Sequence, residues 1–188
     1  MRHRMNIIWG NYCCDTIDNM KRHKPHVRSK TGDHILILGA WIVLCELVGV
    51  IGSMLTIPQI STWYPTLVKP FFSPPNWVFG PVWTLLYACM GFAAYRIWLQ
   101  GMKKREHRIA MGIFLVQLGV NFLWSFIFFD RHNIPGGFID IAVMWLLILY
   151  LVVKLEHIDR LASYAMIPYL LWVSFAMVLN YYLWLLNV

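Results

Sequence analysis

Long apolar segments, separated by short polar connections, occupy most of the chain after residue 34. Five of these segments approach the roughly 20 residues that an α-helix needs to cross a bilayer core about 30 Å thick. We predict membrane-spanning helices at residues 35–57, 77–99, 109–129, 134–153 and 161–186. The predicted fold is therefore all-α, a polytopic membrane protein built as a bundle of five transmembrane helices.

Prolines set several of the predicted helix ends. Pro58 should close the first helix, and Pro74, Pro75 and Pro81 should open the second, at positions where a helix needs no N–H donor. Pro168 lies inside the fifth segment, where a bend is expected.

The residues before the first predicted helix differ in composition from the rest. Residues 1–34 are polar and basic, whereas the chain as a whole is 59% hydrophobic and only 13% charged. This charged fraction is about half that of an ordinary soluble domain, which excludes disorder and disfavours a soluble fold. We predict a basic N-terminal tail, residues 1–34, and a membrane domain, residues 35–188.

Basic residues are distributed unevenly between the two sides of the predicted bundle. Of the 16 lysines and arginines, only Lys69 and Arg131 fall on the side opposite the N-terminal tail. The positive-inside rule places the N-terminus in the cytoplasm and, with five helices, the C-terminus on the other side. Topology and anionic lipid headgroups account for the net charge of +7, so the expected partner is the lipid bilayer and no nucleic acid is predicted.

The connection between the first two helices is rich in proline and aromatic residues. Residues 58–76 contain five prolines together with Trp63, Tyr64, Phe71 and Phe72. Any one ring could belong to an interfacial aromatic belt. Rigid prolines and several rings together predict a folded lid over the outer mouth of the bundle.

Polar and aromatic side chains recur at helical spacing within three predicted helices. Amides in hydrocarbon must face protein or a cavity, so these faces are expected to point inward. The stripes are Gln117, Asn121, Trp124 and Phe128 in the third helix, Trp83 and Tyr87 in the second, and Trp172, Phe175, Ala176 and Leu179 in the fifth. They describe a flat, apolar, ring-lined slot suited to a planar macrocycle. Two alternatives stay open: the amides could serve only to join helices, and the rings could be ordinary packing.

Two acidic residues lie within the predicted spans. Asp140 is about two turns into the fourth helix and is predicted to cap or bridge helices, because a buried carboxylate needs a partner or a proton. Glu46 lies near the middle of the first helix, close to Gly49 and Gly52, whose spacing suggests a tight helix contact and a candidate dimer seam. Neither acid is predicted to be catalytic.

The histidines and cysteines do not form a recognisable metal site. All seven histidines fall in the tail, in loops or at helix ends, so no imidazole is placed in mid-membrane to ligate haem iron. Cys13, Cys14, His23 and His26 could be assembled into a metal site, but their spacing matches no zinc pattern. No metal site, no obligatory cofactor and no disulfide is predicted.

Trp, Pro and polar residues also recur at fixed offsets along the chain. The series begins with Trp63-Tyr64, Lys69-Pro70, Pro74-Pro75 and Phe79-Gly80-Pro81-x-Trp83, and continues with Gln117-x-x-x-Asn121-x-x-Trp124, Asp140, Pro168-Tyr169-x-x-Trp172-x-x-Phe175 and Asn180-Tyr181. In these motifs residues 35–184 closely resemble the tryptophan-rich sensory protein and translocator protein family, TspO/MBR. The resemblance implies a five-helix bundle, often dimeric, that binds porphyrins and, in some members, sterols and synthetic benzodiazepine-type drugs.

The inward stripes and the resemblance together give a set of candidate ligand-binding residues. They are Trp63, Pro75, Trp83, Tyr87, Gln117, Asn121, Trp124, Asp140, Trp172, Phe175 and Ala176. The resemblance implies a protoporphyrin-like tetrapyrrole as the ligand, a homodimer as the assembly and a bacterial inner membrane as the location.

Three functions are compatible with the resemblance. The leading interpretation is a tetrapyrrole-binding membrane protein that acts as a sensor or regulator in stress or porphyrin metabolism. Some bacterial members are reported to promote light-dependent porphyrin breakdown, and the matching positions here, Trp83 and Trp172, are candidate photochemical residues of an enzyme. A porphyrin or sterol transporter is the third. Residues 179–188 lack the basic residue of the sterol consensus, and five helices cannot form an inverted repeat.

The charge distribution generates a topological prediction. A reporter fused after Val188 is expected to lie outside the cytoplasm and one fused before Met1 inside it, because the basic side is retained in the cytoplasm. The activity of paired reporters that function on only one side of the membrane tests this, and a cytoplasmic C-terminus would contradict the five-helix count.

Overall fold

A computed structural model describes residues 31–187 of the chain. These residues form five long helices and the connections between them. They are α2 (Thr31–Ser61), α3 (Asn76–Leu99), α4 (Arg105–Ser125), α5 (Ile134–Ile158) and α6 (Arg160–Asn187), with a π-helical continuation of α4, η2 (Phe126–Asp130), and a short 3-10 helix, η1 (Tyr64–Thr66). All five are long and apolar enough to cross a membrane. The predicted all-α, five-helix membrane fold is confirmed.

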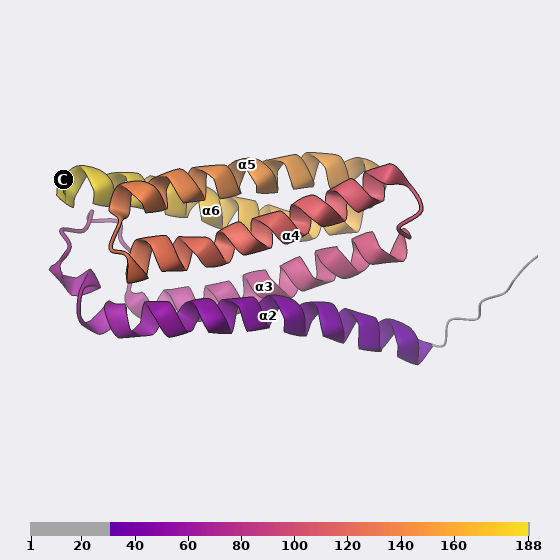
Figure 1. Cartoon of the computed structure of the whole chain (residues 1–188), viewed down its shortest axis with the longest axis horizontal. Coiled ribbons are helices and arrows are strands. Elements are labelled where there is room, and N and C mark those ends of the chain that lie inside the picture. The colour runs from indigo at the N-terminus through magenta and orange to yellow at the C-terminus, as the bar shows by residue number, and fades with distance from the viewer. Residues whose placement is uncertain (1–30, 188) are drawn as a thin grey trace, which may run out of the picture. The chain divides into compact units, whose positions relative to one another are not determined.

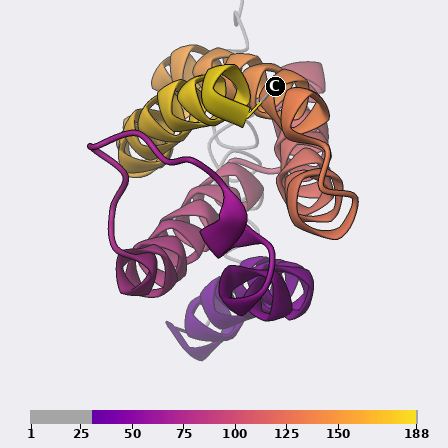
Figure 2. The same ribbon diagram turned by 90° about the vertical axis from the view of Figure 1, so that its left-hand side faces the viewer.

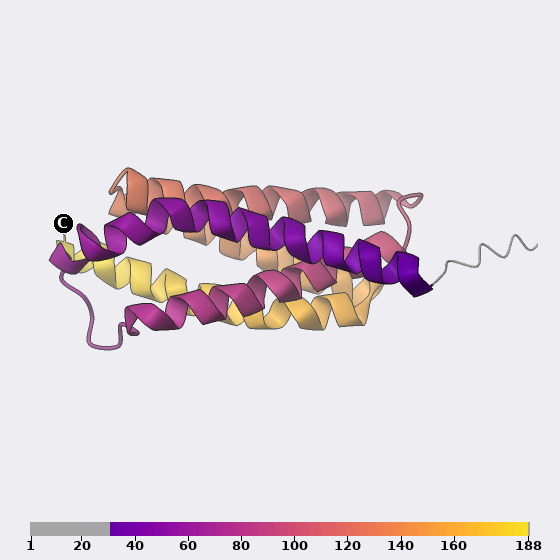
Figure 3. The ribbon, with the colours of Figure 1, turned by 90° about the horizontal axis from the view of Figure 1, so that it is seen from below.

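The chain divides into two units, Met1–His34 and Ile35–Val188, and the second contains the helix bundle. Within it, α5 packs against both α4 and α6, and α6 packs against α3 (Figure 1). In the view from below, α2 lies in front of the other helices and crosses α3 (Figure 3). Figure 2 looks along the helices and shows the α2–α3 loop running across one end of the bundle, near the end of α6.

The two ends of the bundle differ in chemistry. We call one the loop end: it contains the α2–α3 loop, residues 131–133 and the end of α6. The other, the basic end, contains the α3–α4 and α5–α6 connections. Within residues 31–187, the basic side chains of the loop end are Lys69 and Arg131, and those of the basic end are Arg96, Lys103, Lys104, Arg105, Arg108, Lys154 and Arg160.

The interior and the outer faces of the bundle are both apolar. Side chains such as Phe114, Ile148 and Met166 are completely buried, whereas Leu36 and Leu171 are largely exposed on the outside. An apolar exterior suits helices whose surroundings are lipid, because the backbone polar groups are already satisfied within each helix.

Glycines permit the close approach of α2 to its neighbours. A Cβ atom added to Gly91 of α3 would lie 2.5 Å from the Cα atom of Ile42, so only glycine allows these two backbones to approach so closely. Gly49 faces the Tyr87 ring of α3, and Gly52 faces Ser125 of α4. The predicted tight contact of Gly49 and Gly52 is therefore confirmed as a contact within one chain, and a dimer seam at these residues stays a prediction.

Two predicted helix ends also need correction. Pro58 does not close the first helix but lies inside α2, which continues to Ser61. Pro81 lies inside α3, whose start is set by Pro75 in the N-cap position. In lipid, a proline within a helix is tolerated when neighbouring groups satisfy the freed carbonyl, so proline alone does not mark a boundary. Pro168 lies inside α6, as predicted.

Helix α5 runs five residues beyond its predicted end at residue 153 and stops at Ile158. The apolar segment alone set the prediction, whereas the helix continues through Lys154 and Glu156 at the basic end. Backbone hydrogen bonds continue wherever the chain remains helical, whether or not its side chains are apolar. A single residue, Asp159, then separates α5 from α6.

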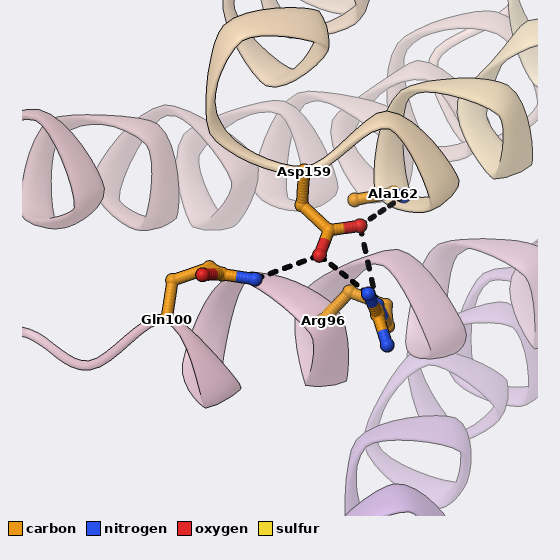
Figure 4. A network of polar contacts seen from close by, with 4 residues as sticks. All are labelled: Arg96, Gln100, Asp159 and Ala162. Carbon is orange, nitrogen blue, oxygen red and sulfur yellow. Dashed lines mark hydrogen bonds and ion pairs between the residues drawn. The ribbon is translucent and has the colours of Figure 1, made fainter.

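Asp159 joins three helices at the basic end. Its carboxylate accepts hydrogen bonds from Arg96 Nη2 at 2.6 Å, from Gln100 Nε2 at 2.7 Å and from the backbone N–H of Ala162 at 3.0 Å (Figure 4). The bond from Ala162 caps the start of α6, while Arg96 lies in the last turn of α3 and Gln100 is its C-cap residue. The Asp159 side chain is only 4% exposed and that of Arg96 28%. The α5–α6 turn is thereby tied to α3.

Burial and hydrogen bonding act in opposite directions on Asp159. Burial raises the pKa of this carboxyl, but the hydrogen bonds from Arg96, Ala162 and Gln100 and the Arg96 charge outweigh it, so the pKa lies below its ordinary value. A carboxyl group whose pKa is lowered by folding stabilises the folded state at pH values above its pKa in the unfolded chain. This stabilisation is lost as the pH falls through its pKa in the folded state.

We therefore expect Asp159→Asn to lower the free energy of unfolding by about 1–3 kcal/mol at neutral pH, because a charge-assisted network is broken. The loss should shrink as the pH is lowered below the ordinary carboxyl range. Thermal unfolding in detergent at several pH values measures both effects. The control is Glu106→Gln, which removes a 3.3 Å ion pair to Lys154 whose Glu106 side chain is 63% exposed, and should change little. Equal effects of the two variants would contradict the assignment.

Candidate functional site

A cavity of about 490 Å³ is lined by residues of all five long helices, of η2 and of the lid, in the half of the bundle nearer the loop end. Its size is within the range of small-molecule sites, about 300–1,000 Å³. The residues around it are mostly apolar or aromatic, with a few polar groups between them. This composition suits a ligand with a large apolar body and few polar substituents.

Six of the eleven candidate ligand-binding residues line this cavity. They are Trp83, Tyr87, Asn121, Trp124, Trp172 and Ala176, contributed by α3, α4 and α6. The other five, Trp63, Pro75, Gln117, Asp140 and Phe175, do not line it. The inward orientation of the three stripes is thus observed, whereas ligand binding by these residues stays a prediction.

Aromatic rings form much of the cavity wall and its support. The Trp83 ring lies 5.5 Å from that of Tyr87 and 6.2 Å from that of Tyr169, measured between centroids. On α4 and η2, Trp124 stacks on Phe128 with the ring planes 12° apart. Rings that contact other rings in this way have few alternative rotamers, so the wall is rigid.

A buried hydrogen-bond chain lies beside the deeper part of the cavity. The Tyr87 hydroxyl donates to Asn121 Oδ1, Asn121 Nδ2 donates to the Tyr169 hydroxyl at 2.9 Å, and Tyr169 donates to Gln117 Oε1 at 3.1 Å. The chain links α3, α4 and α6. Gln117 has the helix-joining role that its alternative interpretation proposed, whereas Asn121 both joins helices and faces the cavity.

The two acids of the spans occupy different environments. Asp140 is buried on α5, and one of its carboxyl oxygens has no hydrogen-bond partner among the described residues. None of the hydrogen bonds observed in residues 31–187 makes it a helix cap or bridge, so the predicted role is not seen. Glu46 of α2 lines the cavity, which its sequence position did not indicate, since α2 is apolar on every side.

Three buried polar atoms at the cavity residues have no partner in the described structure. They are the indole nitrogens of Trp124 and Trp172 and the side-chain oxygen of Asn180. Asn180, like Glu46, was absent from the candidate set. Its membership in the Asn180-Tyr181 motif was the only sequence signal that could have drawn attention to it.

The α2–α3 loop is a folded lid, as predicted. At its start, Trp63 stacks on His132 with ring centroids 4.3 Å apart. Farther along, the Val68 N–H donates to Asn187 Oδ1 at 2.8 Å, and Asn187 Nδ2 donates back to the Val68 carbonyl at 2.9 Å. The Phe72 ring packs edge-on against Tyr182 of α6. The lid is thereby attached to the α4–α5 turn and to the end of α6.

Tyr64 is the lid residue that also lines the cavity. It is buried against Phe129, and the Lys69 ammonium lies 4.0 Å from its ring centroid. Burial raises the pKa of the Tyr64 phenol, although a hydrogen bond with Ser73 lowers it in part. The phenol is therefore neutral at physiological pH.

One sequence interpretation lies outside the described residues. The metal site considered for Cys13, Cys14, His23 and His26 falls within residues 1–30. Of the cysteines that the structure describes, Cys45 and Cys89 are free thiols.

Five helices long enough to cross a membrane surround an aromatic cavity, and a folded loop lies at one end of the bundle. This is the architecture of a polytopic membrane protein with an internal pocket. The sequence profile of the TspO/MBR family matches residues 41–185, and the chain belongs to this family. It is an integral membrane protein.

Proteins from distant organisms are similar to this chain over most of their length. The tryptophan-rich protein TspO of Archaeoglobus fulgidus is 41% identical over 154 residues, which cover 82% of this chain and 99% of that protein. The human translocator protein is 32% identical over 135 residues, 71% of this chain and 80% of that protein. The tryptophan-rich sensory protein of Cereibacter sphaeroides is 31% identical over 145 residues, covering 75% and 89% respectively.

The two amides of the α4 stripe should respond differently to substitution. Asn121→Leu is expected to weaken binding of protoporphyrin, because Asn121 lines the cavity, with little loss of helix content. Gln117→Leu should leave the affinity intact and lower the free energy of unfolding by about 1–2 kcal/mol, since the Tyr169 hydroxyl loses an acceptor. Fluorescence titration and thermal unfolding in detergent measure the two effects. Reduced affinity of the Gln117 variant alone would reverse these assignments.

Proposed function

We propose that the chain is a membrane receptor for a protoporphyrin-like tetrapyrrole and acts as a sensor or regulator in stress or porphyrin metabolism. The observation that carries the proposal is the cavity of about 490 Å³ lined by Trp83, Trp124 and Trp172. Apolar rings on three helices suit the faces of a flat macrocycle. Family membership supports the ligand class.

The setting of the receptor is part of the same proposal. We place it as a homodimer in a bacterial inner membrane, with the N-terminus in the cytoplasm. The basic end supports this orientation, since positively charged residues remain on the cytoplasmic side. No obligatory cofactor is needed for a binding role.

A second candidate function is light-dependent porphyrin degradation. Trp83 and Trp172 line the same cavity from α3 and α6, so a bound macrocycle can contact both indoles. An indole can donate an electron to a photoexcited porphyrin, which leaves an indole radical cation and a porphyrin radical anion. Dioxygen, the oxidant, adds to the macrocycle of the radical anion by a new C–O bond, and return of one electron to the indole radical cation restores the indole and leaves an oxygenated macrocycle. This role needs no nucleophile or metal from the protein.

Titration of the purified protein with protoporphyrin, first in the dark and then under illumination, tests both functions. A receptor shifts the porphyrin spectrum and leaves it intact in light, whereas an enzyme bleaches it. Absence of any saturable spectral shift in the dark would reject the binding function.

Trp83→Phe, Trp172→Phe and the double variant separate stacking from electron donation. A phenyl ring retains much of a stacking contribution of about 0.5–1.5 kcal/mol, so dark affinity should fall only slightly. If the indoles donate electrons, bleaching should be abolished in the double variant. The matched control is Trp98→Phe, which removes an indole from the same helix but outside the cavity. Unchanged bleaching in the double variant would reject the photochemical role of these residues.

A further inference from the structure

We propose that the cavity also binds hydrophobic organic cations, with Glu46 of α2 as the counter-ion and the Tyr87 ring as the surface against which the positive charge lies. The ligand class is an aromatic or apolar body that carries one positive charge on nitrogen. This inference concerns the same cavity as the proposed tetrapyrrole receptor, but it does not depend on tetrapyrrole binding. It starts from an acidic residue in the middle of a membrane-spanning helix that forms no ion pair within the described protein.

Glu46 is the single charged residue among those that line the cavity. It is half-buried and lies midway between Thr31 and Ser61, the two ends of α2, about 22 Å from each. From Glu46 the α2 lining continues through Gly49 and other residues toward the loop end, so Glu46 marks the deep end of the cavity. A carboxylate at such a depth in a membrane requires a cationic partner or a proton.

The described protein offers Glu46 no positive charge. The ion pairs within residues 31–187 lie at the two ends of the bundle and are Arg96–Asp159, Arg131–Asp130 and Lys154–Glu106. Helix α2 contains no lysine or arginine. The basic residue of α3, Arg96, lies about 13 Å beyond Tyr87 along that helix and is held by Asp159. When Glu46 is ionised, its positive partner must therefore come from a ligand.

The ring of Tyr87 lies beside Glu46 at the deep end of the cavity. Gly49 is one turn from Glu46 on the same side of α2, and the Tyr87 ring packs so closely against Gly49 that an added Cβ atom would overlap it. Positions three apart on a helix are about 5–6 Å from each other, so the carboxylate and the ring border the same space. The Glu46 charge also acts electrostatically on the Tyr87 phenol. The Trp83 ring, 5.5 Å from that of Tyr87 between centroids, extends this aromatic surface.

A carboxylate beside aromatic faces suits an organic cation. The face of an aromatic ring attracts a positive charge, and does so more strongly where water is excluded. A metal ion would need several ligand side chains, and residues 31–187 contain no group of three His, Cys, Asp or Glu residues that could hold one. The apolar walls match instead the hydrophobic body of an organic ligand. An anionic group is disfavoured at the deep end because Glu46 repels it.

Two probes of the same shape test the role of Glu46 as counter-ion. N-methyl-4-phenylpyridinium carries one positive charge, and 4-methylbiphenyl has the same two-ring skeleton with carbon in place of the charged nitrogen. Equilibrium dialysis of the purified full chain in detergent gives a dissociation constant for each probe. For every variant, the ratio of the neutral to the cationic dissociation constant is compared with that of the parent protein, which cancels partitioning into detergent.

Glu46→Gln keeps the size of the side chain and removes its charge. It should weaken binding of the cation about ten- to hundredfold, as expected for the loss of a charged partner in an apolar site, and leave binding of 4-methylbiphenyl unchanged. The matched control is Glu106→Gln, the same substitution outside the cavity, which should alter neither. Thermal unfolding reports whether each variant is folded, and Glu46→Gln is expected to fold because it removes an unpaired charge from a membrane span.

A second pair of variants tests the ring. Tyr87→Leu and Tyr87→Phe both lose the hydrogen bond to Asn121, but only phenylalanine retains an aromatic face. The cation should bind Tyr87→Leu about two- to tenfold more weakly than Tyr87→Phe. The neutral probe should show a smaller difference, since it carries no charge for the ring to attract.

The outcomes separate this inference from the proposed receptor function. If the parent protein does not bind the cation saturably, or if Glu46→Gln and Glu106→Gln change its affinity equally, cation binding at Glu46 is rejected. If Glu46→Gln does not fold, equal affinity of the cation for the two Tyr87 variants rejects it instead. Protoporphyrin is titrated into the same parent protein. Binding of protoporphyrin without the cation leaves the receptor function intact, whereas binding of the cation without protoporphyrin rejects the receptor function alone.

Discussion

Hydrogen bonds among Tyr87, Asn121, Tyr169 and Gln117 tie α3, α4 and α6 together at the depth where the cavity ends. In a bilayer these groups cannot turn to water, so each must find its partner inside the bundle. The chain fixes the rotation of three helices about their axes. Trp83, Trp124 and Trp172 then face one space because they stand on the same faces as the linked residues.

Periodicity predicted the architecture and the inward faces, because lipid requires apolar segments of a set length and directs amides such as Gln117 and Asn121 inward. Periodicity could not predict which residues of α2 line the cavity. That helix is apolar on every side, so no stripe distinguishes Glu46 and Gly49, which face the cavity, from Leu47, which faces outward. The helix ends predicted at Pro58 and Pro81 were wrong for a related reason. Tertiary packing, which the sequence pattern does not show, decides whether a helix continues past a residue that lacks an N–H donor.

The lining residues divide into two kinds of surface. The rings and aliphatic groups provide a rigid apolar slot that is indifferent to which apolar body fills it. Selectivity must come from the few polar atoms that are left unsatisfied, because an unpaired donor or acceptor penalises any ligand that cannot match it. Among the described residues, the lining therefore combines a large apolar area with a few unpartnered polar atoms, such as the Asn180 oxygen.

The paired hydrogen bonds between Val68 and Asn187 have a consequence for biosynthesis. The two residues are 119 positions apart, and Asn187 is the penultimate residue of the sequence. During synthesis the lid leaves the ribosome long before the end of α6, and for that interval these Val68 backbone groups have no Asn187 to pair with. The Val68–Asn187 pair can thus attach the lid only after α6 has been synthesised. Docking of the lid therefore follows the synthesis of α6.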